Sequence, residues 1–355
     1  MALPLTDEPV IEPDLPIVDA HHHLWLLPEG SIAEMEKRDS IYAPALAPTF
    51  RRHARYLLDE FLADVSSGHN IRSTVFVDAG AMYRADGEES MRSVGEVEFV
   101  NGVAAMSASG RFGESRICAG IVGGVNLSLG DAVVEVLEAH LRAGGTRYRG
   151  VRSAQVVAHD ADWRILGPGV GIPYLLLDRR FRDGFHHLHR LGLSFDVWLF
   201  EPQLPELIDL ARSSPDTSII LNHVGGPLGI GRYAGQREAR FPVWLRNIQT
   251  LARCQNVTVK LGGLGLPFPG FSSFGKEPGA TSEVLASEWR PYVESCIEAF
   301  GPDRCMFQSN FPVDAASGSY RAIWNAFKRL TVGASAHEKA ALFGGTATRI
   351  YRLAH

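Results

Sequence analysis

The sequence predicts an α/β protein, a single-domain (β/α)8 TIM barrel with long strand-to-helix loops, and three observations support this fold class. Eight short apolar runs alternate with eight amphipathic patterns along the 355 residues, as in a parallel barrel covered by helices. The connections after the strands are often long, whereas those before the strands are short. Barrels build their active sites from such long loops. An open doubly wound sheet shares the alternation but does not match the count of eight.

The predicted strands are apolar on both faces, which is typical of strands that lie between covering helices and a barrel core. They comprise residues 15–21, 73–77, 117–125, 147–151, 193–199, 218–221, 257–261 and 305–308. The predicted helices have apolar residues at the helical period. They comprise residues 53–66, 94–109, 131–143, 178–191, 204–213, 241–253, 283–300 and 319–330. Within one domain, 1–355, we expect residues 1–14 to be an N-terminal extension and 331–355 a C-terminal helical segment.

Two of the long connections, residues 24–52 and 262–282, are expected to roof the barrel mouth. Both leave strand carboxyl ends, and the second is rich in Gly, Pro and Phe, a composition suited to a shaped apolar lid. A subunit interface made from the same residues is an equal alternative.

Composition and charge exclude several classes of protein. Thirty-five Lys and Arg against 40 Asp and Glu give a net charge of −5, which leaves no basic excess for nucleic acid. No apolar run approaches the roughly 20 residues of a membrane span, and the acidic, proline-rich N-terminus does not resemble a signal peptide. The four scattered cysteines are expected to be buried thiols. We therefore expect a cytoplasmic protein with a small-molecule substrate and no nucleic-acid or membrane partner.

The strongest chemical signal is the segment VDAHHHLW at the end of the first strand. Residues i and i+2 of a strand point to the same side, so His21 and His23 should face the barrel mouth together and His22 should point away. Two converging imidazoles suit zinc, iron or manganese. The alternative is a set of hydrogen-bonded core histidines.

Further candidates come from other strand ends. His223 ends the sixth strand and could add a third imidazole, or could merely hydrogen-bond there. Asp78 and Glu201 follow two other strands, and each carboxylate could bind the metal or orient a histidine that does.

The eighth strand brings polar groups to the same mouth. Gln308 and Asn310 offer amides, and Asp314 is the nearest carboxylate that could act as a base. Arg152 at the end of the fourth strand and Lys260 in the seventh could hold a substrate carboxylate. A structural ion pair within the barrel is at least as good an explanation of these cations. Asp196 is expected to be a helix-facing or surface charge.

With these residues in place, the chain resembles the amidohydrolase superfamily, and specifically its amidohydrolase-2 branch, over nearly its whole length. The resemblance rests on VDAHHHLW, FVDAGAMYR, YRGVR, FDVWLFEPQLPEL, LNHVGGPLGIG, VKLGGLG, MFQSNFPVD and ALFGGTATRIYRL. It implies a (β/α)8 barrel that activates water on one or two divalent metals to cleave an ester, lactone, thioester or amide. By this resemblance His21 and His23 match the ligand pair of the first strand, and His223 matches the histidine of the sixth.

The chain also departs from the pattern of its close relatives. Side chains with ligand or proton-transfer capacity are replaced by Ser153, Gln308 and Gly344. Asn310 stands where the wider superfamily has a catalytic aspartate. These departures argue against a two-metal centre but leave residues for one metal, with zinc favoured and iron or manganese as alternatives.

Two hypotheses follow from this resemblance. The first is a metal-dependent hydrolase with Asp314 and Asn310 as catalytic residues and Arg152 and Gln308 as substrate-binding residues. The second is a diverged subunit with one structural metal in an oligomer with a paralogous partner, similar to the two-subunit oxygenase that hydroxylates 2-aminoisobutyrate. Three imidazoles and a carboxylate from Glu201 or Asp78 would leave no open position on tetrahedral zinc. We therefore expect weak hydrolysis from the isolated chain.

Overall fold

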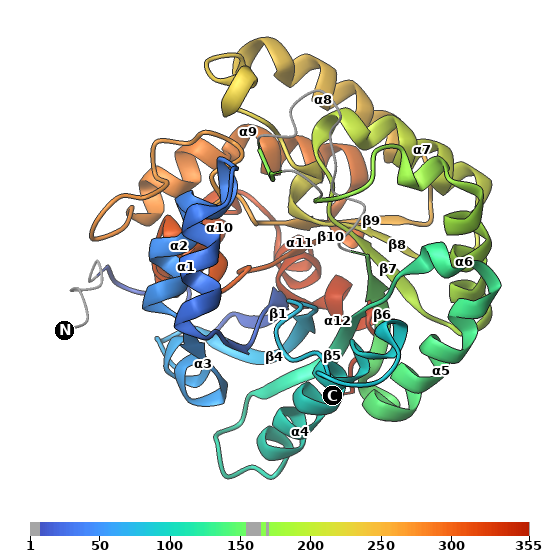
Figure 1. Ribbon diagram of the computed structural model, residues 1–355. Helices are drawn as coiled ribbons and strands as arrows, with labels where there is room; N and C mark the ends of the chain where they lie inside the picture. The colour runs from blue at the N-terminus through green and yellow to red at the C-terminus, as the bar shows by residue number, and fades with distance from the viewer. Residues whose placement is uncertain (1–7, 154–164, 168–169, 355) are drawn as a thin grey trace.

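The computed structural model describes residues 8–153, 165–167 and 170–354, which form a barrel of eight parallel strands surrounded by helices (Figure 1). The strands follow one another in chain order around the sheet. They are β1 (Pro16–His22), β4 (Asn70–Val77), β5 (Arg116–Gly124), β6 (Tyr148–Arg152), β7 (Ser194–Val197), β8 (Ile219–Leu221), β9 (Val257–Leu261) and β10 (Cys305–Phe307). The predicted fold class is confirmed, and all eight predicted strands are present.

Backbone contacts just beyond β10 bring the last strand to the first. Asn310 N donates to His21 O at 2.9 Å, and His23 N donates to Phe311 O at 2.8 Å. The sheet is thereby nearly closed, so the carboxyl ends of all eight strands meet around a single mouth.

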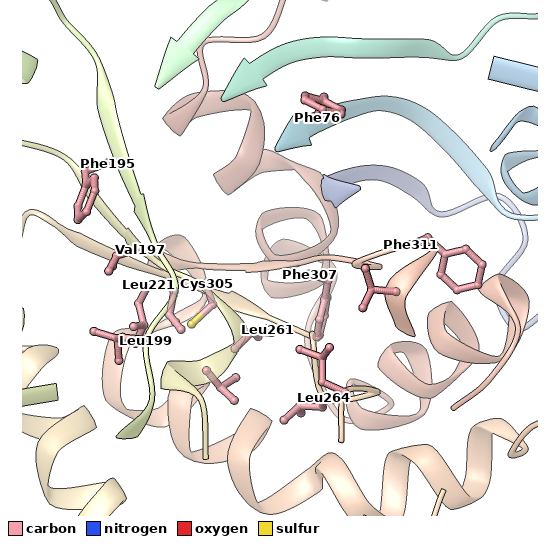
Figure 2. Packing of buried hydrophobic residues seen from close by; sticks show 14 of the residues in the cluster. Phe76, Phe195, Val197, Leu199, Leu221, Leu261, Leu264, Cys305, Phe307 and Phe311 are labelled. Atoms are coloured by element: carbon pink, nitrogen blue, oxygen red, sulfur yellow. The ribbon is translucent and has the colours of Figure 1, made fainter. Parts of the chain in front are cut away.

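The main covering helices follow their strands as predicted. They are α3 (Leu58–Val65), α4 (Val94–Ala108), α5 (Val133–Gly144), α6 (Arg179–Arg190), α7 (Leu204–Ser213), α8 (Arg237–Leu251), α9 (Ser282–Phe300) and α10 (Tyr320–Leu330). Outward-facing strand residues pack against this layer, and Figure 2 labels Phe195, Leu221 and Phe307 among them.

The connection after β1 is more ordered than the sequence indicates. Residues 24–52, expected to be a loop, contain β2 (Trp25–Leu26), α1 (Glu29–Lys37) and α2 (Tyr42–Arg52). The predicted helix 53–66 begins only at Leu58, because β3 (Arg55–Tyr56) pairs with β2. Prolines 44 and 48 disfavour a helix in this segment. Burial of an apolar face of α2 outweighs this unfavourable helix propensity.

The C-terminal segment covers the end of the barrel at which the strands begin. It forms α11 (Ala336–Ala340), a π-helical turn (Ala341–Gly345) and α12 (Thr346–Ile350). Tyr351 and Leu353 then pack among the inward-facing strand residues. The four cysteines are free thiols, three of them buried and Cys254 partly exposed. In the described part of the chain no helix has both the length and the apolar character needed to cross a bilayer.

Candidate active site

Three imidazoles gather at the barrel mouth. His21 and His23 extend from the end of β1, with Nε2 of one 3.2 Å from Nε2 of the other. His223 follows β8, and its ring centre lies 5.0 Å from that of His21. His22 points the other way and stacks on Phe61 of α3 at 4.1 Å. The alternation predicted for the three successive histidines is therefore confirmed.

Burial keeps these imidazoles neutral. It lowers the pKa of His23 to about 3 and the pKa values of His21 and His223 well below the usual range. Nearby cations add to this effect, Lys260 for His21 and Arg152 for His23 and His223. Neutral imidazole is the form that binds a metal.

A backbone carbonyl fixes the protonation of His23. Its Nδ1 lies 2.7 Å from Val77 O at the end of β4. A carbonyl can only accept, so the proton is on Nδ1 and the lone pair is on Nε2. A metal-ligating histidine ordinarily has this arrangement.

His223 is held by a strained turn and a tight contact. Both His223 and Val224 have left-handed backbones, with φ of 54° and 48°, a conformation that is costly for a β-branched residue. A Cβ atom on Gly263 would lie 1.8 Å from His223 Nδ1, so only glycine fits there. Gln308 contacts the same nitrogen through Nε2 at 2.6 Å. Strain of this kind is typical of functional sites.

The donor set can be compared with what a metal requires. Two nitrogens bound at 2.0–2.1 Å to one ion lie about 3.0–3.4 Å apart, and the Nε2 atoms of His21 and His23 are separated by 3.2 Å. In the described residues, however, no three His, Cys, Asp or Glu side chains are placed to hold an ion as they stand. The pair thus fits a shared ion, while the three imidazoles together do not form a ligand set as they stand.

The two carboxylates suggested as ligands lie in different surroundings. Glu201 forms an ion pair with Arg240 of α8, and burial nevertheless raises the pKa of Glu201 to about 7. Asp78 accepts a hydrogen bond from Tyr83 at 2.8 Å and lies close enough to His23 to affect its pKa. Their roles as ligands remain predictions.

After β10, Asn310 and Asp314 are joined by a hydrogen bond. Asn310 Nδ2 donates to Asp314 Oδ1 at 2.7 Å, and Gly265 N donates to Oδ2 at 3.0 Å. Asn310 also reaches His23, and its own backbone is left-handed, with φ of 53°. Burial raises the pKa of Asp314 to about 7, against the effect of these hydrogen bonds.

The comparison with known families agrees with this geometry. Residues 18–353 match the amidohydrolase family model. This chain belongs to the amidohydrolase family.

Relatives of this amidohydrolase extend over nearly its full length. A protein of Sinorhizobium fredii called y4mH, itself uncharacterised, is 34% identical over 96% of this chain and 99% of its own. An L-fucono-1,5-lactonase of Burkholderia ambifaria is 25% identical over 95% of each chain.

Solved structures share the fold of this amidohydrolase. An amidohydrolase of Burkholderia multivorans with bound zinc has a TM-score of 0.70 and 22% identity, covering 95% of this chain and 99% of its own. A 5-carboxyvanillate decarboxylase of Novosphingobium aromaticivorans complexed with manganese has a TM-score of 0.59 and 14% identity, covering 96% and 97%.

The loop after β1 and the loop after β9 meet above the histidines of this amidohydrolase, as expected for a roof. Tyr42 of α2 stacks on Phe268 at 4.6 Å with an interplanar angle of 8°. Trp198 lies 5.5 Å from Phe268 and 6.0 Å from His223. The guanidinium of Arg152 lies 5.6 Å from the centre of the Trp198 ring. The roof is therefore aromatic and carries one cation.

Two donors of this roof lack partners. Arg152 Nε and Trp198 Nε1 are buried and have no hydrogen bond within the described part of the chain, although Arg152 Nη1 donates to Asp78 O at 2.9 Å. Buried donors are rarely left unsatisfied without a reason such as a ligand or water. Arg152 was predicted to bind substrate, and this role remains a prediction.

Glu96 of α4 was not found by sequence analysis. It is buried, accepts from Ala81 N at 2.8 Å, and lies beside Asp78. Burial, together with the charge of Asp78, raises the pKa of Glu96 well above its usual value. Glu96 is on a helix rather than at a strand end, so no spacing rule indicates it. It supports the backbone just after β4.

A polar cavity of about 750 Å³ opens beside these residues, at the ends of β4, β5 and β6. Asp78, Tyr83, Asn126 and Arg152 line it. A cavity of about 860 Å³ lies at the opposite end of the barrel, beside Pro16 and the other strand starts. Of these two cavities, the first lies at the carboxyl ends of the strands and includes the candidate residues Asp78 and Arg152.

One prediction about the barrel interior is wrong. Asp196 is neither helix-facing nor on the surface, because its side chain points into the barrel and is fully buried. Its Oδ1 lies 2.6 Å from Lys260 Nζ, which is also fully buried. The alternative of a structural ion pair is therefore confirmed for Lys260.

Proposed function

We propose that this protein is a metal-dependent hydrolase that opens the lactone of a small polyhydroxylated acid, using one divalent ion at His21, His23 and His223. The observation that carries the proposal is the 3.2 Å separation of two facing imidazole nitrogens at the barrel mouth. When bound, a divalent ion there supplies an activated water and polarises the carbonyl.

Three protein ligands would leave a coordination position for water on a bound ion, which supports hydrolysis. Glu201 is paired with Arg240, so the proposed ligand set consists of three imidazoles without that carboxylate. Three protein ligands and a water are the usual composition of a catalytic zinc site. The expectation of weak hydrolysis assumed a fourth protein ligand from Glu201 or Asp78. Asp78 accepts a hydrogen bond from Tyr83 and is not used as a ligand in this proposal, so we expect the isolated chain to be active.

The chain's own residues have distinct tasks in this proposal. Asp314 accepts the proton of the attacking water, and Asn310, held by Asp314, orients that water beside His23. Arg152 donates to a carboxylate or hydroxyl of the substrate through its unpartnered Nε. The aromatic roof excludes water and offers the Trp198 ring face to the sugar-like ring.

The lactone substrate class comes from the relatives named L-fucono-1,5-lactonase and from the polar lining of the cavity. The test is metal analysis of the purified chain, followed by hydrolysis of sugar-acid 1,5-lactones and of simple aryl esters as comparison substrates. We expect about one equivalent of zinc or manganese and lactone turnover of roughly 1–10³ per second. Turnover that is insensitive to chelation, or confined to aryl esters, contradicts the proposal.

The pH dependence of hydrolysis should reflect Asp314. Its pKa is raised to about 7 by burial, and only the ionised carboxylate accepts a proton, so kcat/KM should rise with pH through about 7. Asp314→Asn should abolish the rise of kcat/KM near pH 7 and lower kcat/KM by about 10²–10⁴-fold. Asp64→Asn is the matched control, since Asp64 also has a raised pKa, about 6, but lies in α3. An unchanged profile in Asp314→Asn would exclude Asp314 as the base.

The oxygenase-subunit hypothesis has no support from the relatives described above, because those with a named activity or family are a lactonase, an amidohydrolase and a decarboxylase. It therefore remains a hypothesis from sequence alone, as does the oligomeric state.

A further inference from the structure

The cavity of about 860 Å³ at the strand starts is rich in positive charge. Its charged lining residues are four arginines and one glutamate, namely Arg72, Arg116, Arg349, Arg352 and Glu114. The chain as a whole has a net charge of −5, so this excess of positive charge is local. Guanidiniums gathered around a concave surface favour the binding of an anion.

The positive charge of this cavity is only weakly offset by the protein. Glu114 Oε2 lies 3.8 Å from Arg72 Nη1, and the glutamate side chain is 93% exposed. In the part of the chain that the structure describes, the other three guanidiniums contact backbone carbonyls. Arg116 donates to Glu114 O at 2.8 Å, Arg352 donates to Gly192 O at 2.8 Å, and Arg349 donates to Asp303 O. A carbonyl has no net charge, so it satisfies a donor without neutralising the guanidinium.

Arg352 stands at a position where glycine is the usual residue. It follows α12 with a left-handed backbone, φ of 47°. Leu353 N donates to Thr348 O at 3.0 Å and Arg352 N donates to Arg349 O at 3.3 Å, which are the hydrogen bonds of a Schellman C-cap. Glycine adopts the left-handed conformation at little steric cost, whereas arginine does not. The backbone therefore does not explain an arginine here, but a role of its guanidinium in the cavity does.

The cavity also has an apolar part. Gly344 and Gly345 end the π-helical turn and line the cavity, so no side chain from these two residues fills it. The buried side chains of Val18 and Leu353 line it as well, whereas the four arginines are exposed. A ligand can thus place an apolar body in the cavity and a charged group among the arginines.

We propose that this cavity binds a small organic anion, with a doubly charged head held by the arginines and an apolar body against Val18 and Leu353. Guanidiniums pair well with the oxygens of phosphate and carboxylate groups. A doubly charged head offsets more of the positive charge than a single carboxylate does. The volume is adequate, since small-molecule sites ordinarily measure about 300–1,000 Å³. The site lies away from the barrel mouth, so the proposal is independent of the proposed function.

Titration calorimetry of the full chain with three probes tests the proposal. Phenyl phosphate joins a dianion to an apolar ring above about pH 7, isophthalate is a dicarboxylate counterpart, and benzyl alcohol has the ring without the charge. We expect phenyl phosphate or isophthalate to bind one site with a Kd below about 1 mM, and benzyl alcohol not to bind. The tighter of the two anions tells whether the natural head is a phosphate or a pair of carboxylates. If neither anion binds, or if benzyl alcohol binds equally well, the proposal is wrong.

Two variants distinguish a built site from general attraction to positive charge. Arg352→Gly should weaken binding of the tighter anion by about tenfold or more and leave Tm close to that of wild type, because glycine suits this backbone. Ala340→Trp keeps every charge but adds a large side chain to the lining, and it should weaken binding as well. A lower Tm with unchanged affinity in Arg352→Gly would show that the arginine is only structural. Unchanged affinity in Ala340→Trp would show that the anion does not enter the cavity.

Arg180→Gln is the matched control. It removes one exposed guanidinium from α6, and Arg180 does not line the cavity. Affinity for the anion should equal that of wild type, and an equal loss in Arg180→Gln and Arg352→Gly contradicts a specific site. His21→Ala/His23→Ala should also retain the affinity. If binding disappears in that double variant but persists in Arg352→Gly, the anion binds at the barrel mouth and the proposal is overturned.

Discussion

Replacing His21 and His23 together with alanine is expected to remove the bound metal and to lower lactone hydrolysis by at least about 10³-fold. The two imidazoles are the facing pair whose nitrogens lie 3.2 Å apart, and His223 alone offers too few ligands for tight binding. Metal content by atomic emission and kcat/KM on a lactone measure the two effects separately.

The matched control for this double variant is His187→Ala/His189→Ala. This change also removes two imidazoles two residues apart, but from α6, where His187 contacts Asp131 and His189 contacts Asp216 O. Metal content and activity should stay at the wild-type level in the control. If the His21→Ala/His23→Ala protein retains its metal, the proposed ligand set is wrong.

The second large effect is expected on stability. Asp196→Asn should lower the free energy of unfolding by about 3–5 kcal/mol, because it leaves the buried ammonium of Lys260 without its counter-charge. Asparagine keeps an oxygen for the Tyr351 hydroxyl and nearly the same volume, so the loss reports on charge and not on packing. Urea denaturation at constant pH measures it.

An exposed ion pair provides the comparison for Asp196→Asn. Asp183 and Arg179 of α6 lie 3.9 Å apart with side chains 49% and 94% exposed. Asp183→Asn should change the free energy of unfolding by no more than about 0.5 kcal/mol, because solvent screens exposed pairs. A loss below about 1 kcal/mol in Asp196→Asn would show that Lys260 is not held as an ammonium by Asp196.

The barrel was accessible from the sequence because its signals are local. Alternation of apolar runs and helical patterns depends on neighbouring residues. The ends of each predicted strand lie within a few residues of the ends of an observed strand. The opposite directions of His21 and His22 follow from strand geometry for the same reason. Helix α2 was missed because its prolines are unfavourable locally and its buried face is created by distant partners such as Phe268.

The surroundings of each charged group, in contrast, were decided by the tertiary structure. Nothing in the local sequence distinguishes Asp196, buried against Lys260, from Glu201, paired with Arg240. Glu96 lies on a helix and meets Asp78 only when α4 packs against the barrel. Local sequence patterns were sufficient to predict the fold and the histidines that converge at the mouth. Only the folded barrel decided which ions pair and which tautomers form, because these depend on burial and on contacts between residues far apart in the chain.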